Sequence, residues 1–263
     1  MKTPEQLIDN LHLEDLQNAM HPSFFDENEL YDMLIIRIPV ITDELNIKSF
    51  GFIITQEKSY LYNIETKTFE EFSDRFMELY SMIDNNIDRL LKSFIKYQET
   101  ISDMEEALYA NNLNSDFLNT WLSIKLEILR IERVLLRATT TMDDFIGYYK
   151  NSDEFPVNHY IDIHEHIERT MRSATLQLSK LDYLYSFYNA KSNDKMNKMI
   201  YILTIISAIF LPLNLVVGFF GMNTSSLPFS GGVNGTFFAV LLMMILGIVT
   251  LSVVQFWRKK VEK

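Results

Sequence analysis

The chain has 263 residues, of which 48% are hydrophobic and 22% are charged, and its formal net charge is −11 at pH 7. It contains no cysteine, which excludes disulfide bonds, cysteine-ligated zinc, iron–sulfur clusters and a thiol nucleophile. The acidic balance argues against a nucleic-acid partner, because phosphate binding needs clustered Lys and Arg, and it is compatible with the handling of cations.

The N-terminal stretch MKTPEQLIDN lacks the apolar region of a signal peptide, so we expect the first 198 residues to stay in the cytosol. The sequence holds no P-loop, GxGxxG, HExxH, GxSxG or EF-hand pattern. No nucleophile or acid/base constellation stands out either, and we therefore expect a protein that is not an enzyme.

Residues 1–71 are predicted to form a cytosolic α/β domain. Tyr31–Val40 and Ser49–Thr55 are short apolar runs rich in Ile and Val, and Ser59–Asn63 is a third. Polar turns bound these runs, which is typical of a small sheet. We expect helices within Pro4–Met20 to flank it.

Residues 72–198 are predicted to form a cytosolic helical stalk. Apolar residues recur at spacings of three and four from Phe72 to Leu108, without Pro or Gly, which indicates a long helix. A second stripe runs from Trp121 to Phe145. A third helix begins at Val157, after Pro156, and shows no break before Pro212.

Residues 199–263 are predicted to form a transmembrane domain, because no Asp, Glu, Lys, Arg or His occurs from Met199 to Trp257. Two spans, 199–220 and 236–254, each approach the ~20 residues that cross a bilayer, and an external loop, 221–235, joins them. Basic residues lie on both outer sides: Lys191, Lys195, Lys198, Arg258, Lys259, Lys260 and Lys263. This arrangement places both termini in the cytosol.

The first predicted span carries its polar residues on one face, which we call the polar seam. Its members are Asn197, Ile200, Thr204, Ser207, Leu211, Asn214, Gly218 and Gly221. A seam of small and polar residues could glue helices together, or it could line a water-filled pore if several copies packed around an axis. The seam continues towards the cytosol as Asp182, Ser186, Asn189 and Asn193, which favours a wet lumen.

The tripeptide Gly221-Met222-Asn223, at the outer end of the first of two C-terminal spans, resembles the signature of the CorA family of divalent-cation transporters. The segment Asn197–Asn223 and the basic tail Trp257–Lys260 are similar to that family as well. The resemblance implies a funnel-shaped homopentamer whose long helix lines the pore. It also implies an α+β cytosolic domain with long stalk helices, followed by two transmembrane helices.

The resemblance assigns roles along the pore. Asn223 would be the selective mouth, with Gly221 and Met222 shaping the turn, and the remaining pore positions would be Asn214, Leu211, Ser207, Thr204, Leu203, Ile200 and Asn197. Mg²⁺ gives up its waters reluctantly, and rings of amide oxygens can accept hydrogen bonds from a hydrated ion without stripping it. Apolar rings could gate by dewetting.

The loop after Asn223 lacks the acidic residues that are common in the family, so uptake is expected to be slower or less driven by charge. A subgroup that resembles ZntB is associated with zinc and proton coupling, and the sequence leaves Mg²⁺ against Zn²⁺ open. The chain is short for the family, which implies a trimmed N-terminal sheet.

In the family, cytosolic Mg²⁺ bound between subunits holds the channel closed. The candidate regulatory residues here are Asp143, Asp144, Asp153, Glu154 and, above all, Asp162; the alternative for each is a solvated acidic surface. His159, Asp162 and His166 share one helix face and could bind zinc, whereas His164 lies off that face.

The sequence thus predicts an inner-membrane channel or transporter of the CorA type, passing hydrated Mg²⁺ down the membrane potential. Its expected partners are membrane lipid, further copies of itself and divalent cations. The alternatives are a proton-coupled zinc transporter of the ZntB type and, in a different class, a membrane-anchored interaction protein.

Overall fold

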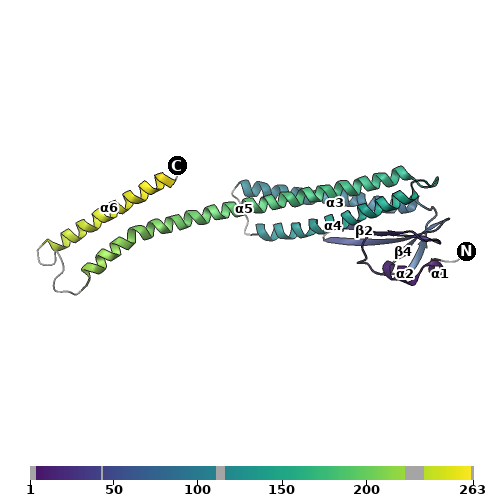
Figure 1. Cartoon of the computed structure of the whole chain (residues 1–263), viewed down its shortest axis with the longest axis horizontal. Helices are drawn as coiled ribbons and strands as arrows, with labels where there is room; N and C mark the ends of the chain where they lie inside the picture. The colour runs from purple at the N-terminus through teal and green to yellow at the C-terminus, as the bar shows by residue number, and fades with distance from the viewer. Residues whose placement is uncertain (1–3, 43, 111–115, 223–233, 262–263) are drawn as a thin grey trace. The chain divides into compact units, whose positions relative to one another are not determined.

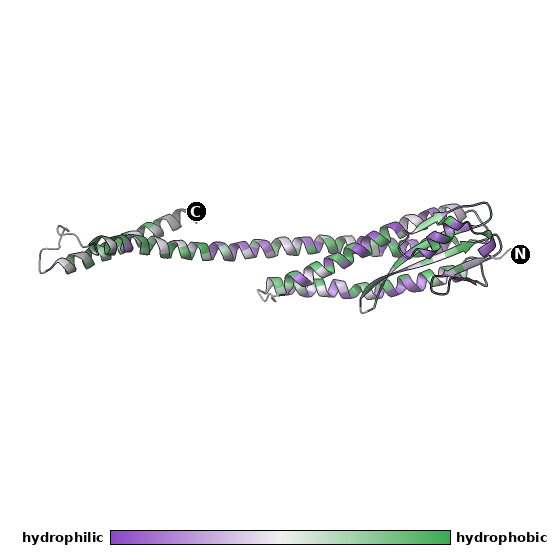
Figure 2. Cartoon of the chain, turned by 90° about the horizontal axis from the view of Figure 1, so that it is seen from below, coloured by the Kyte–Doolittle hydropathy of each residue, from purple (hydrophilic) through white to green (hydrophobic). Residues whose placement is uncertain are grey.

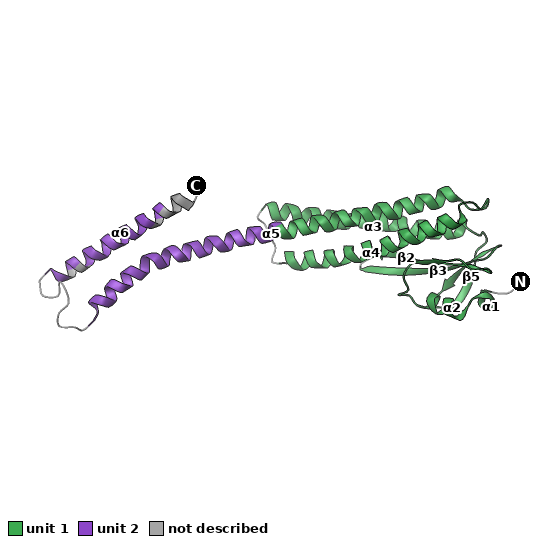
Figure 3. Ribbon diagram, viewed as in Figure 1, with its two compact units in different colours: residues 1–186 green, residues 187–263 purple. Residues whose placement is uncertain are grey.

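The computed structural model of the chain describes residues 4–42, 44–110, 116–222 and 234–261 (Figure 1). The chain divides within helix α5 (Val157–Phe220) into two compact units, residues 1–186 and 187–263 (Figure 3). Each unit is described by itself.

The first unit contains a five-stranded antiparallel sheet whose strand order follows the chain. Its strands are β1 (Phe24–Asp26), β2 (Asp32–Ile41), β3 (Leu45–Ile54), β4 (Ser59–Asn63) and β5 (Thr68–Glu71). The three apolar runs predicted as strands coincide with β2, β3 and β4. Strands β1 and β5 were not predicted, because runs of 3 and 4 residues are too short to show an alternating pattern.

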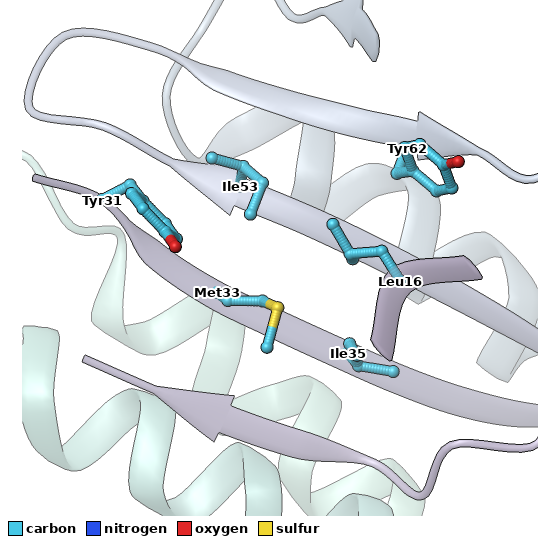
Figure 4. Close-up of a cluster of buried hydrophobic side chains, with 6 residues drawn as sticks. All are labelled: Leu16, Tyr31, Met33, Ile35, Ile53 and Tyr62. Carbon is cyan, nitrogen blue, oxygen red and sulfur yellow. The ribbon is translucent and has the colours of Figure 1, made fainter. Parts of the chain in front are cut away.

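One face of the sheet is covered by two short helices, α1 (Pro4–Leu7) and α2 (Asn10–Gln17). Leu16 of α2 packs into a cluster of buried side chains from the sheet, as Figure 4 shows: Tyr31, Met33, Ile35, Ile53 and Tyr62. Successive side chains of a strand point to opposite faces. The neighbouring residues Leu34, Ile36 and Phe52, all fully buried, therefore belong to the other face.

The other face packs against helices α3 (Met77–Tyr109) and α4 (Phe117–Tyr149). Phe25 of β1 meets Phe145 of α4 edge to face, with ring centroids 5.3 Å apart. Most of the apolar residues that recur at spacings of three and four are buried, and Leu79, Ile83 and Ile87 of α3 are fully so. The two predicted helices are confirmed as α3 and α4, although α3 begins at Met77 and not at Phe72.

Helices α3, α4 and the first part of α5 form an up-down-up bundle. Helices α3 and α5 run parallel, because the residue numbers of their contacts rise together in both. Tyr160 Oη donates to Phe76 O (2.8 Å), Gln98 donates to Ser173 (3.0 Å), and Glu105 pairs with Lys180 (2.6 Å). Helices α4 and α5 run antiparallel, because Asp143 pairs with His164 (3.0 Å) whereas the earlier residue Lys125 pairs with the later residue Asp182 (2.5 Å). These pairs show the register of the bundle.

The second unit consists of the remainder of α5 and helix α6 (Gly235–Val261). Helix α5 continues without interruption to Phe220 and holds Pro212 in its interior. Figure 2 shows the apolar character of the C-terminal part of α5 and of α6. Large side chains such as Leu203 (63% exposed), Leu211 (71%) and Leu215 (71%) are exposed along this part of α5. A continuous exposed apolar surface of this kind is typical of a region that contacts lipid or another protein.

Candidate functional site

Among the described residues, α5 is the helix that is long and apolar enough to cross a membrane, and its apolar stretch lies in its C-terminal part. The most apolar stretch of this helix has no buried residue. Helix α6 contains a shorter apolar stretch, Val240–Val253. The first predicted span therefore lies in a suitable helix, whereas the second span, residues 236–254, stays a prediction.

The polar seam of α5 is exposed along its whole described length, from Asn197 to Gly221. The residues of this segment with lower exposure lie on a different face and include Ile205, Ala208, Ile209 and Val216. The polar seam is therefore not used to pack α5 against the described residues of its own chain.

Two features of this segment bear on its polarity. The hydroxyl of Thr204 donates to the carbonyl of Ile200 at 2.8 Å, which satisfies it within the helix. Pro212 lacks an amide N–H, so the carbonyl of Ala208 loses the donor that this position would otherwise supply.

Of the residues predicted at the mouth, Met222 is exposed. Asn223, the predicted mouth residue, lies outside the described residues.

A second candidate site lies in the first unit, where α3 and α5 run side by side. It consists of Asp84 on α3 together with Asp162 and His166 on α5, whose ligand atoms all lie within 4.8 Å of one another. Asp162 Oδ1 is 3.8 Å from His166 Nε2. The Asp162 side chain is 56% exposed and that of His166 is 23% exposed, so an ion could reach the site from solvent.

The local sequence explains why these three side chains converge. Ile83 and Ile87 of α3 and Ile163 and Ile167 of α5 are fully buried, and they hold the two helices together. Each candidate ligand is adjacent in sequence to one of these isoleucines. The ligands therefore emerge at the edge of the helix contact, where carboxylates and an imidazole can meet without being fully desolvated.

The site concentrates negative charge. The pKa of the Asp84 carboxyl is raised from its ordinary value, first by burial and then by the neighbouring carboxylates of Asp88 and Asp162. His166 and a hydrogen bond with Tyr80 act in the opposite direction. The pKa of the Tyr80 hydroxyl is raised as well, mainly by burial and by Asp84. A bound divalent cation would relieve this crowding of carboxylates.

The other predicted regulatory acids do not join this site. Asp143 lies 3.0 Å from His164, and Glu154 forms an ion pair with Arg75 at 3.7 Å. Asp144 and Asp153 are exposed. Among the described residues, the group of three that could hold a metal is the one around Asp162.

The predicted face of His159, Asp162 and His166 is only partly used. Asp162 and His166 contribute to the cluster, whereas the ring of His159 packs edge-on against Tyr80, 4.9 Å between centroids. Asp84 was not predicted, because the pattern of α3 alone gives no sign of which helix it faces. Asp182, expected to extend the polar seam towards the cytosol, instead pairs with Lys125 of α4.

The fold thus defines an α+β domain with a helical bundle whose last helix continues into a membrane-compatible apolar segment. A sequence model of the family described as "CorA-like Mg2+ transporter protein" matches residues 4–260. The chain therefore belongs to this family.

Three relatives illustrate the similarity. The chain is 26% identical over 198 residues to the magnesium transport protein CorA of Helicobacter pylori, covering 75% of this chain and 58% of that protein. It is 22% identical over 171 residues to the zinc transport protein ZntB of Vibrio parahaemolyticus, covering 65% of this chain and 53% of that protein. The structure of the CorA magnesium transporter from Methanocaldococcus jannaschii matches with a TM-score of 0.75 at 15% identity, covering 96% of this chain and 87% of that one.

The chain spans about half the length of the first curated relatives that it matches, from 47% to 58%. The structural match shows the same fold, so the predicted α+β domain with a long helix is confirmed.

Proposed function

We propose that the chain is the subunit of a divalent-cation transporter in the cell inner membrane, with a pathway lined by the polar seam of α5. The observation that carries this proposal is the exposed seam on a membrane-compatible helix. A lipid-facing anchor needs no amides or hydroxyls, because polar groups in hydrocarbon are costly. One chain cannot enclose a pore, so the proposal includes a homo-oligomer, a pentamer by resemblance to the family.

Hydrated Mg²⁺ is the proposed ion. Asn223 and Asn214 would present amide oxygens to the water shell of the ion, while Ile200, Leu203 and Leu211 would form apolar rings that gate by dewetting. Asn197, Thr204 and Ser207 would line the rest of the pathway, and Gly221 and Met222 would shape its mouth. An inside-negative potential favours entry of a divalent ion by about 4.6 kcal/mol per 100 mV.

The proposed organisation follows the domains predicted from the sequence. Residues 1–71 and 72–198 form the cytosolic domain and stalk, and residues 199–263 form two spans with both termini in the cytosol. Asp162, now joined by Asp84 and His166, is the leading regulatory metal site. Asp143, Asp144, Asp153 and Glu154 are secondary candidates for weak cation binding.

A second candidate function is proton-coupled zinc transport. Its support is the similarity to the zinc transport protein ZntB, which extends over 65% of this chain. The two functions differ in the transported ion and in their response to a proton gradient, so one flux experiment separates them.

The test is ion flux into proteoliposomes at a fixed inside-negative potential, comparing Mg²⁺ with Zn²⁺ in the presence and absence of a pH gradient. Mg²⁺ entry that ignores the pH gradient would support the magnesium transporter. Zn²⁺ entry that follows the proton gradient would support zinc transport. If folded, oligomeric protein passes neither ion, the membrane-anchored interaction protein becomes the better description.

Variants locate the pathway in the same assay. We expect Asn223→Ala and Asn214→Leu to reduce flux by about tenfold or more, equivalent to at least about 1.4 kcal/mol in the barrier. Thr204→Val, in the polar seam, and Thr250→Val, in α6, form a matched pair, because both hydroxyls donate to a carbonyl one turn earlier. Only the seam variant should lower flux, and equal effects would contradict the proposed pathway.

A further inference from the structure

A row of lysines precedes the apolar part of α5. Lys191, Lys195 and Lys198 are spaced by four and three residues, so they share one face of the helix, which we call the lysine face. We propose that the lysine face binds the headgroups of anionic phospholipids in the cytosolic leaflet of the membrane. The inference rests on one part of the proposed function, namely that the apolar part of α5 crosses the membrane.

The lysine face lies opposite the polar seam. Below the apolar part of α5 the seam is made of Asn189, Asn193 and Asn197, which are also spaced by four residues. At about 100° per residue, these asparagines lie roughly on the opposite side of the helix from the lysines. If the seam lines an ion pathway, the lysine face points away from it. The lysines then meet the surroundings of α5 and do not form a ring of positive charge in the path of a cation.

The charges of the lysine face are not neutralised by the protein. Lys195 and Lys198 are exposed, and neither forms an ion pair with another residue in the described part of the chain. In the first unit, by contrast, Lys58, Lys125 and Lys180 each pair with a carboxylate. Unpaired positive charge in a chain with a net charge of −11 attracts an anionic partner from outside the chain.

The depth of the lysines fits the headgroup layer. Lys198 directly precedes Met199, where the predicted span begins, and at 1.5 Å per residue Lys195 lies about 6 Å and Lys191 about 12 Å below that point. The layer between hydrocarbon and water is about 5–8 Å deep on each side, and flexible lysine side chains extend towards it. Tyr201, one turn after Lys198, is 43% exposed, as is common for aromatic residues at this interface.

The chemistry of the lysine face selects a phosphate group that carries net charge. An ammonium group is a compact point charge with three hydrogen-bond donors, and it binds phosphate without requiring a fixed orientation. Each basic residue near an anionic membrane surface strengthens the attraction by about fivefold. A zwitterionic headgroup cancels most of this gain. Asp194 is the one acidic residue among residues 187–198 and lies one turn before Lys198, so it weakens the positive potential there.

Lipid titration of the purified full-length protein in a non-ionic detergent tests this inference. The probe is phosphatidylglycerol, and native mass spectrometry counts the lipids that remain bound at each concentration. We expect phosphatidylglycerol to bind at least tenfold more tightly than zwitterionic phosphatidylcholine. The preference should shrink as the salt concentration rises, because ions screen exposed charges.

The double variant Lys195→Gln/Lys198→Gln should weaken phosphatidylglycerol binding at least tenfold, because two charges are lost. Lys195→Arg/Lys198→Arg keeps both charges and should stay within about twofold of the unmodified protein. The matched control is Lys92→Gln/Lys96→Gln, which removes two exposed lysines of α3 that also form no ion pair in the described part of the chain. Its affinity should not change by more than about twofold.

Removal of the neighbouring acid should have the opposite effect. The variant Asp194→Asn raises the positive charge around Lys198 without touching a lysine, so it should strengthen phosphatidylglycerol binding by about twofold to fivefold. A gain in affinity cannot come from a misfolded protein. Weaker binding in Asp194→Asn would contradict the inference.

Equal affinity for the two lipids, or equal losses in the two double glutamine variants, would overturn the inference. Displacement of phosphatidylglycerol by an equimolar amount of inorganic phosphate would show a site for a free anion, and would overturn it as well. The variant Asn223→Ala separates this outcome from that of the proposed pathway, since it should lose ion flux and keep its lipid affinity. Selective lipid binding by a protein that passes neither Mg²⁺ nor Zn²⁺ would support the lysine face and contradict only the proposed transport.

Discussion

At the scale of single residues, a buried hydrogen bond joins the helical bundle to the sheet. The hydroxyl of Tyr149, at the end of α4, donates to the carboxylate of Asp32, the first residue of β2. Both residues are buried, at 5% and 7% exposure, and the backbone amide of Asn28 also donates to Asp32 at 3.2 Å. Burial and this hydrogen bond raise the pKa of Tyr149, so its hydroxyl stays protonated at neutral pH.

The variant Tyr149→Phe should lower the free energy of unfolding by about 1–3 kcal/mol, because it leaves the buried carboxylate of Asp32 with one donor fewer. Denaturation of the full chain in detergent, followed by circular dichroism, measures the change. Tyr60→Phe is the control, since the hydroxyl of this half-buried tyrosine makes no hydrogen bond to the described residues. Equal losses in the two variants would contradict the assigned role of the pair.

Three buried tyrosines should make the fold sensitive to alkali. Burial raises the pKa of Tyr97, Tyr149 and Tyr160 above the ordinary value of about 10. In the unfolded chain these hydroxyls ionise near pH 10, whereas in the folded chain they keep their protons. Their contribution to stability is therefore complete below pH 10 and falls as the pH rises above it.

We expect the unfolding free energy to decline above pH 10 by up to about 1.4 kcal/mol per pH unit for each such tyrosine. Denaturant titrations between pH 8 and pH 11.5 measure this slope. Tyrosinate absorbance should report the three hydroxyls only on unfolding. If every tyrosine of the folded protein titrated near pH 10, the expectation would be wrong.

At the scale of elements, helix α2 lies close to the sheet at a glycine of β3. Gly51 of β3 lies beneath Leu16, and a β-carbon at this position would stand 2.4 Å from Leu16 Cδ2. Leu16 is buried in the cluster on this face, so it has little room to move. Gly147, within α4, is exposed, and a β-carbon added there would meet nothing within 4 Å beyond its chain neighbours and the backbone of its own helical turns.

The same substitution should therefore have opposite effects at these two positions. Gly51→Ala should destabilise the protein by about 1–3 kcal/mol through overpacking. Gly147→Ala should stabilise it by about 0.5–1 kcal/mol, because alanine loses less conformational freedom in a helix. Thermal unfolding of both variants and the parent checks the signs, and destabilisation by Gly147→Ala would count against the helix assigned there.

At the scale of the whole molecule, the two units differ in how they treat their apolar side chains. The first unit buries most of its large hydrophobic residues in the sheet and bundle, whereas the second leaves most of its own exposed.

A fragment of residues 1–186 should therefore be soluble without detergent and unfold cooperatively. The full chain should need detergent or lipid, because the apolar surface after residue 187 has no cover in water. Size-exclusion chromatography and circular dichroism of both proteins test this expectation. Aggregation of the fragment, or solubility of the full chain in plain buffer, would contradict the division into these units.

The sequence alone was enough to predict the strands β2 to β4, the three long helices and the apolar segment of α5. Each of these depends on a local repeat, of two residues in a strand or of three to four in a helix, or on a long gap in charge. Such patterns lie within one segment of the chain, so they can be read without knowing what that segment contacts. The polar seam could be predicted for the same reason.

Only the tertiary structure decided which side chains from different helices meet. Asp84 joins Asp162 and His166 because buried isoleucines set the rotation and register of α3 against α5. The same register pairs Asp182 with Lys125 and Asp143 with His164. Packing between helices depends on side chains far apart in the sequence, and a turn of a few tens of degrees would separate these groups. No periodicity within a single helix carries that information.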